Sequence, residues 1–87
     1  MKEFGLYLRE YKFCFYDTEA DDTFYRYGSF ATTPKAKDYA RHMLGIYRHV
    51  DMVTISKVHE RKKYKIWKVV NTYHREDLIK INSVKNH

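Results

Sequence analysis

Cysteine, proline and glycine are all scarce in this chain of 87 residues, which holds one, one and three copies of them. The single cysteine, Cys14, cannot form an internal disulfide, so no covalent staple supports the fold and an oxidising compartment is not indicated. No Pro/Gly/Ser-rich stretch divides the chain, and its length is ordinary for one domain. We therefore expect residues 1–87 to form a single domain.

Long apolar runs are also missing. No run approaches the roughly 20 residues that a membrane-spanning helix needs. The residues at 1–5 do not begin the long apolar segment of a secretory signal. The sequence therefore predicts a protein without a membrane contact, located in the cytoplasm.

Catalytic and metal-binding motifs are absent as well. The chain has no glycine-rich phosphate loop, no Gly-x-Ser-x-Gly elbow and no HExxH or finger-like Cys/His set. Asp17, Glu19, Asp21 and Asp22 are spaced somewhat as in a calcium loop, but the sixth and twelfth positions hold Asp22 and Gly28. A calcium loop needs glycine and a bidentate glutamate there. We expect no enzyme activity, no metal and no cofactor.

Aromatic residues and positive charge are plentiful. Nine Tyr, five Phe and one Trp contribute to an apolar fraction of 44%, which excludes a disordered chain. The net charge of +6 comes from residues 34–87, where thirteen Lys/Arg face five Asp/Glu, because residues 1–33 carry four against six. Such a basic surface attracts phosphates or acidic proteins.

Hydrophobic patterns predict an α+β fold. Alternating aromatic residues favour strands within residues 3–16 and 23–27, joined by an acidic connection at 17–22. The alternation changes phase after Leu8, so a bulge or short break near Glu10 is needed if both halves of the first strand are to face one core. A helix is predicted over 34–48, capped by Thr33 and begun by Pro34. Its apolar stripe is Ala36, Tyr39, Ala40, Met43, Leu44 and Tyr47.

Strand-favouring residues resume after this helix. They occupy 50–58 and 63–70, which predicts a second hairpin. The tail contains Leu78, Ile79 and Ile81, which fit either a short strand or a short helix. The expected order is β-β-α-β-β plus an uncertain C-terminal element. It corresponds to an antiparallel sheet of four to five strands with one amphipathic helix packed on it.

The second hairpin is a candidate binding surface. Its members are Lys57, Arg61, Lys62, Lys63, Tyr64, Lys65, Trp67 and Lys68. Lysines neutralise phosphates and aromatic rings stack on bases, and Lys63, Lys65 and Trp67 would share one face of a strand. Alternatively, the lysines only keep an exposed sheet edge from pairing, and Trp67 belongs to the core.

The acidic connection is a second candidate surface. Asp17, Glu19, Asp21 and Asp22 either form a solvated hairpin loop or present a negative patch to a basic groove of another protein. Opposite charge would then bring the two proteins together.

Two resemblances bear on function. The residues YRYGSFAT at 25–32 and KAKDYA at 35–40 look like the strand-then-helix entry of the peptidoglycan-binding sporulation-related repeat, without its second half. More broadly, a small, Tyr-rich, Lys-rich and cysteine-poor chain resembles accessory proteins of phages and mobile elements, among them anti-CRISPR proteins and other host-takeover inhibitors. This second resemblance implies a phage-encoded inhibitor, acting in the host cytoplasm.

Three functions follow as hypotheses. The first is a non-enzymatic binding protein that sterically blocks a host nucleic-acid-processing or defence complex, such as a nuclease. The alternative is a stand-alone nucleic-acid-binding regulator that uses the basic hairpin at 57–68. The third is a small RNase toxin, since such enzymes can work with scattered His, Arg, Tyr and Lys. The sequence does not indicate the oligomeric state.

Overall fold

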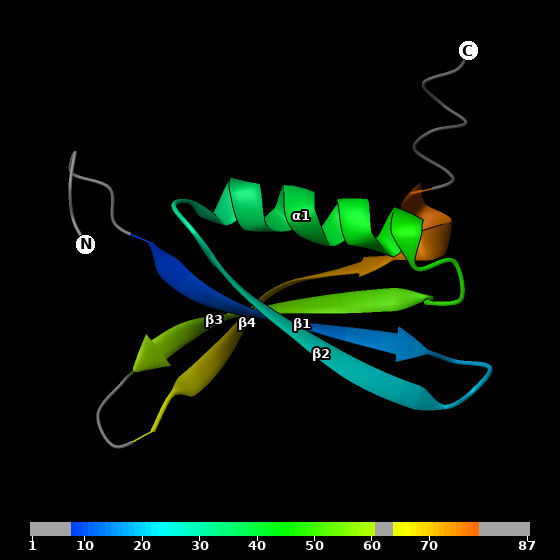
Figure 1. Cartoon of the computed structure of the whole chain (residues 1–87), viewed down its shortest axis with the longest axis horizontal. Helices are drawn as coiled ribbons and strands as arrows, with labels where there is room; N and C mark the ends of the chain where they lie inside the picture. The colour runs from blue at the N-terminus through cyan, green and yellow to red at the C-terminus, as the bar shows by residue number, and fades with distance from the viewer. Residues whose placement is uncertain (1–7, 61–63, 79–87) are drawn as a thin grey trace, which may run out of the picture.

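The computed structural model describes residues 8–60 and 64–78. Its elements are β1 (Arg9–Asp17), β2 (Asp22–Phe30), α1 (Thr33–Ile46), β3 (Met52–Glu60), β4 (Ile66–His74) and a helical turn over 75–78. The four strands form one antiparallel sheet in the order β2-β1-β3-β4, and α1 lies across one face of it (Figure 1). The predicted α+β fold and the order β-β-α-β-β are confirmed.

The core lies between α1 and the sheet. Alternation along β1 places Tyr11, Phe13 and Phe15 on the helix side, each at most 1% exposed. The rest of the core is Ala36, Ala40, Leu44, Val50, Val53 and Ile55. The predicted helical stripe therefore faces the core: three of its members are fully buried, and Tyr39, Met43 and Tyr47 are partly buried against them.

The start of α1 differs from the prediction by one residue. Thr32, not Thr33, is the N-cap: its backbone is extended, and its Oγ1 accepts a hydrogen bond from the Lys35 N–H at 3.4 Å. The Thr33 hydroxyl instead shares a 2.9 Å hydrogen bond with the hydroxyl of Tyr11. This bond ties the first turn of the helix to β1. Thr33 does not serve as the cap because it is already the first helical residue, directly after the extended Thr32.

The end of α1 is closed by Arg75, from the helical turn that follows β4. Its guanidinium donates to the Val50 carbonyl at 2.7 Å, to the Tyr47 carbonyl at 2.5 Å and to the carbonyl of Leu44. A helix leaves its last carbonyls without partners and carries partial negative charge there, so a cation is well placed. Of the two options for the tail, residues 75–78 take the helical one, whereas Ile79 and Ile81 lie outside the described residues.

Strand irregularities occur where the sequence did not predict them. β1 pairs with β2 in unbroken register from Arg9 to Asp17, so the expected bulge near Glu10 is wrong. Leu8 is 55% exposed and does not join the core, and the residues before it in the predicted strand lie outside the described part of the chain. The register shifts instead between β3 and β4, at Ile55/Ser56 and at Val58/Glu60.

Candidate functional site

The face of the sheet opposite α1 carries no helix in the described part of the chain (Figure 1). We call it the open face. The strand register places on it Glu10, Lys12, Cys14 and Tyr16 from β1, Tyr25, Tyr27 and Ser29 from β2, Thr54 and Ser56 from β3, and Trp67, Val69 and Thr72 from β4. Because side chains alternate along a strand, these residues point away from the core.

Three aromatic rings and one cation meet on this face. The rings of Tyr27 and Trp67 come from the two outer strands, and their centroids lie 5.9 Å apart at an interplanar angle of 54°. Lys12 Nζ lies 5.2 Å from the Trp67 centroid and 5.7 Å from that of Tyr25, within cation–π range. We call Lys12, Tyr25, Tyr27 and Trp67 the aromatic cluster. Trp67 is therefore not a core residue, the alternative that the sequence left open.

A hollow of about 220 Å³ adjoins the aromatic cluster. It is lined by Glu10, Tyr11, Tyr27, Gly28, Ser29 and Trp67. Tyr11 and Gly28 are register partners whose side-chain positions face α1, so the backbone of these two residues forms the floor. The rings of Tyr27 and Trp67 border the hollow, while the carboxylate of Glu10 and the hydroxyl of Ser29 make it polar at one end.

Lys65 borders the same region. It precedes β4, and its Nζ donates to Glu10 Oε2 at 3.0 Å. This ion pair is part-exposed, so it contributes about 0–1 kcal/mol to stability. Its effect is to fix the position of the Glu10 carboxylate beside the hollow.

The other residues of the predicted basic hairpin lie elsewhere. Lys57 and Lys68 are register partners on the helix side of the sheet, because Lys57 also pairs with the inward-facing Tyr11. They do not line the aromatic cluster. Tyr64 is 75% exposed in the connection before β4. The remaining members lie outside the described residues: Arg61, Lys62 and Lys63.

The acidic connection between β1 and β2 is a turn stabilised by its own carboxylates. Asp17 Oδ1 accepts from the Ala20 N–H at 3.3 Å, and Asp22 Oδ1 accepts from its neighbour Thr23 at 3.0 Å. Asp21 has a positive φ of 51°, which aspartate tolerates better than most residues. Glu19 is exposed. The turn therefore uses its acidic side chains to hold its own shape.

Hydrogen bonds shift the pKa values of two residues at this turn. The hydroxyl of Tyr16 donates to Asp21 Oδ1 at 3.1 Å, and this bond to a carboxylate raises the pKa of Tyr16. Asp51, just before β3, accepts from the Thr18 N–H at 2.8 Å. Hydrogen bonds from the Thr18 side chain and backbone hold the pKa of Asp51 below its usual value. Asp51 thus fastens the turn to the start of β3.

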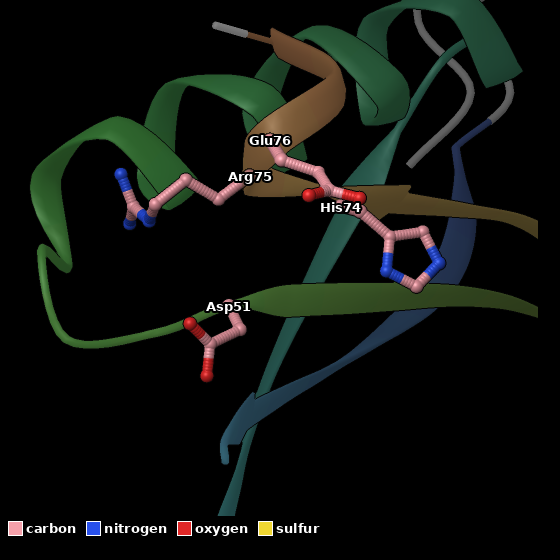
Figure 2. Close-up of a pocket in the computed structure, with 4 residues that line it drawn as sticks. All are labelled: Asp51, His74, Arg75 and Glu76. Carbon is pink, nitrogen blue, oxygen red and sulfur yellow. The ribbon is translucent and has the colours of Figure 1, made fainter. Parts of the chain in front are cut away.

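A second hollow, of about 250 Å³, lies at this end of the sheet and is lined by Asp51, His74, Arg75 and Glu76. Figure 2 shows that the side chain of Arg75 extends toward the end of α1 and that the carboxylate of Asp51 points away from Arg75. The charged ends of both residues are used in the fold, by the carbonyls at the end of α1 and by Thr18. The first hollow, bordered by the exposed ring of Tyr27 and the partly buried ring of Trp67, is therefore the stronger candidate site.

Sequence reasoning missed most of this site. It selected Trp67 and Lys65 but not Glu10, Lys12, Tyr25 or Tyr27. Part of the signal was present, because inward-facing residues at 11, 13 and 15 require Lys12 to point outward. The rest depends on the strand order, which brings the two outer strands' rings together across the sheet.

Two kinds of feature are missing from the part of the chain that the structure describes. Across 8–60 and 64–78, no group of three His, Cys, Asp or Glu side chains is placed to hold a metal ion. In the same part of the chain, no helix combines the length and apolar character needed to cross a bilayer.

Comparisons of the whole chain with protein-family models, with curated proteins and with solved structures found no match. Any inference about a ligand of the open face must therefore start from its own side chains.

Proposed function

We propose that this protein is a non-enzymatic binding protein that holds single-stranded nucleic acid on the open face of its sheet. The observation that carries the proposal is the aromatic cluster, in which Tyr27 and Trp67 lie 5.9 Å apart beside the ammonium group of Lys12. Proteins that bind single strands combine stacking rings with cations that follow the phosphates. The cluster supplies both.

The exposure of the rings supports the same function. Tyr25 is 49% exposed and Tyr27 is 64% exposed, although a complete aromatic core exists on the other face. Tyr and Trp tolerate such partly wet positions because each has an apolar ring and a polar group. Rings gathered on an uncovered sheet face are typical of a recognition surface.

The net charge of +6 also favours a polyanionic ligand. Lys12 lies within the aromatic cluster and Lys65 lies at its border. Phosphate contacts of this kind make binding fall as salt rises. They position the strand, while the rings hold its bases.

The steric inhibitor of a host complex, including its phage origin, stays a prediction. It needs a surface complementary to a protein, and the acidic turn was the negative patch considered for it. Asp17, Asp21 and Asp22 all accept hydrogen bonds within that turn, which reduces their capacity for a partner. The open face is therefore the better supported surface, and protein capture becomes an outcome of the test.

Trp67 allows a direct test because it is the only tryptophan of the chain. Titrating the purified protein with a short oligothymidine should quench and saturate its fluorescence at low salt, and added salt should reverse the quenching. Tyr27→Ala should weaken binding, whereas Tyr64→Ala, an exposed ring outside the cluster, should leave it unchanged. No response at low salt, together with tight binding to a host protein complex, would favour the inhibitor instead.

A further inference from the structure

The three rings of the aromatic cluster surround one ammonium group. Lys12 Nζ lies 5.7 Å from the Tyr25 centroid and 5.2 Å from the Trp67 centroid. Lys12 is also the register partner of Tyr27 on the neighbouring strand. A nucleic-acid strand whose bases lie on these rings therefore has its connecting phosphates close to a single cation.

The spacing of the rings matches the spacing of nucleotides. Tyr25 and Tyr27 are two residues apart on one face of β2, which separates them by about 6.4–6.8 Å along the strand. The centroids of Tyr27 and Trp67 lie 5.9 Å apart. Consecutive nucleotides rise by about 3.4 Å in a stacked strand and by roughly twice that in an extended one. Each step from ring to ring therefore corresponds to one nucleotide of a partly extended strand.

The ring of Trp67 reaches inward from the edge of the sheet. Trp67 belongs to β4 and Tyr27 to β2, which are the two outer strands. Neighbouring strands lie about 4.8 Å apart, so the backbones of β2 and β4 are roughly 14 Å apart. The two rings consequently lean toward each other over β1 and β3. Ser56 of β3 is accordingly only 6% exposed on a face that α1 does not cover. The rings thus form one platform across the sheet.

Both ends of this platform are bounded. At the Tyr25 end, β2 leads back to the acidic turn, where Glu19, Asp21 and Asp22 are exposed. Their negative charge disfavours a phosphate beyond the base on Tyr25. At the Trp67 end the sheet itself ends, because β4 is an outer strand. The platform is therefore three rings long.

We propose that the open face holds a segment of three nucleotides, with one base on each ring of the aromatic cluster and a connecting phosphate beside Lys12. This inference rests on the proposed function and adds the length and the path of the ligand. The path runs along β2 away from the acidic turn and then crosses the sheet to Trp67. A short unpaired segment is therefore sufficient as a ligand.

Unlabelled oligothymidines of one to eight nucleotides test the length of the site by competing with a labelled strand, followed by fluorescence anisotropy. Affinity should rise by about 5- to 150-fold with the second base and again with the third, the range of one base stacked on a ring. From three to eight nucleotides it should rise only with the number of positions at which three nucleotides can bind. A three-nucleotide strand with a terminal abasic position keeps its charge and should lose most of the gain from the third base.

Tyr25→Ala removes the ring at one end of the platform. Two and three nucleotides should then bind with about equal affinity. Tyr64→Ala removes an exposed ring outside the aromatic cluster and should keep the gain at three, and Tyr25→Phe, which retains the ring, should keep it too. If Tyr25→Ala does not fold, as circular dichroism would show, the length series of the natural protein still decides.

Two kinds of result would overturn the inference, and they are distinguishable. Affinity that stops rising before three nucleotides, or that rises by the same factor at each length up to eight, would remove the three-nucleotide site while leaving nucleic-acid binding in place. Absence of binding to every strand at low salt would remove the proposed function and the site with it.

Discussion

The two faces of the sheet are both rich in aromatic residues, yet their rings differ in exposure. On the helix side, Tyr11, Phe13 and Phe15 are at most 1% exposed, whereas on the open face Tyr25 and Tyr27 are 49% and 64% exposed. The strands are the same, and only the helix distinguishes the faces. The sequence of a strand therefore does not show by itself whether an aromatic ring is buried. Burial depends on whether another element packs on that face of the sheet.

The surroundings of the rings differ accordingly. Phe13 packs edge-to-face on Phe30 and Tyr39, with centroids 5.8 Å and 4.8 Å away, an arrangement typical of cores. Trp67 on the open face has the tilted ring of Tyr27 at 5.9 Å and, in addition, the ammonium group of Lys12 beside it. Stability and binding should consequently respond to different substitutions, and the following experiments test that separation.

The largest effect on stability is expected on the covered face. Leu44 is fully buried, so Leu44→Ala should lower the free energy of unfolding by about 2–5 kcal/mol through lost burial and a cavity. Ile46 lies on the same helix but is 54% exposed, and Ile46→Ala should change stability by no more than about 0.5 kcal/mol. Urea unfolding followed by circular dichroism compares them. Equal values for the two variants would show that Leu44 does not anchor the helix.

On the open face, a change in binding should exceed any change in folding. Trp67→Ala should weaken binding of a labelled oligonucleotide by about 1–3 kcal/mol if one base stacks on the ring. Fluorescence anisotropy measures the affinity, and thermal melting checks that the fold survives. Unchanged affinity in a folded variant would contradict a stacking role for Trp67.

The start of the helix should show an intermediate effect on stability alone. Thr32→Ala removes the oxygen that accepts from the Lys35 N–H and should cost about 1 kcal/mol. Thr32→Ser keeps that oxygen and should restore most of the loss. Binding should be unaltered in both variants, since Thr32 lies at the start of α1 rather than on the open face. If Thr32→Ser lost as much stability as Thr32→Ala, the loss would not come from the missing capping hydrogen bond.

Two lysines on opposite faces allow a comparison of charge. Lys12→Met should reduce the log-log salt slope of binding by about 0.7 if that ammonium neutralises one phosphate of a single strand. Lys57→Met removes the same charge from the helix side and should leave the slope nearly unchanged. Equal reductions would mean that net charge, rather than the open face, attracts the strand.

The smallest effect is expected at the end of the sheet, where Asp51 holds the acidic turn. Its pKa is lowered in the folded state, so the carboxylate stabilises the fold above its ordinary pKa and ceases to do so as pH falls through the lowered value. Asp51→Asn should melt slightly earlier than the natural protein at neutral pH. As pH falls through the acidic range, the melting temperatures of the variant and the natural protein should converge. A constant difference between them would show that the Asp51 carboxylate is not its cause.

The covered face was predictable from the sequence and the open face largely was not. Helical spacing alone selected Ala36, Ala40 and Leu44, because burial repeats with the period of the helix. The basic hairpin was grouped by closeness in sequence, and alternation was applied only to Lys63, Lys65 and Trp67. The register places Lys57 and Lys68 on the helix side, away from Trp67. Neighbouring Thr32 and Thr33 can both cap a helix, so the sequence could not choose between them.

The strand order has a consequence for the assembly of the molecule. Tyr27 and Trp67 come from the first and second hairpins, on the two outer strands, and their contact exists only after both hairpins have joined. A ligand that lies on both rings binds the assembled sheet and neither hairpin by itself. Because such a ligand binds only the folded protein, it would stabilise the fold by mass action. The melting temperature should therefore rise with ligand concentration. Binding of such a ligand would therefore be coupled to completion of the fold.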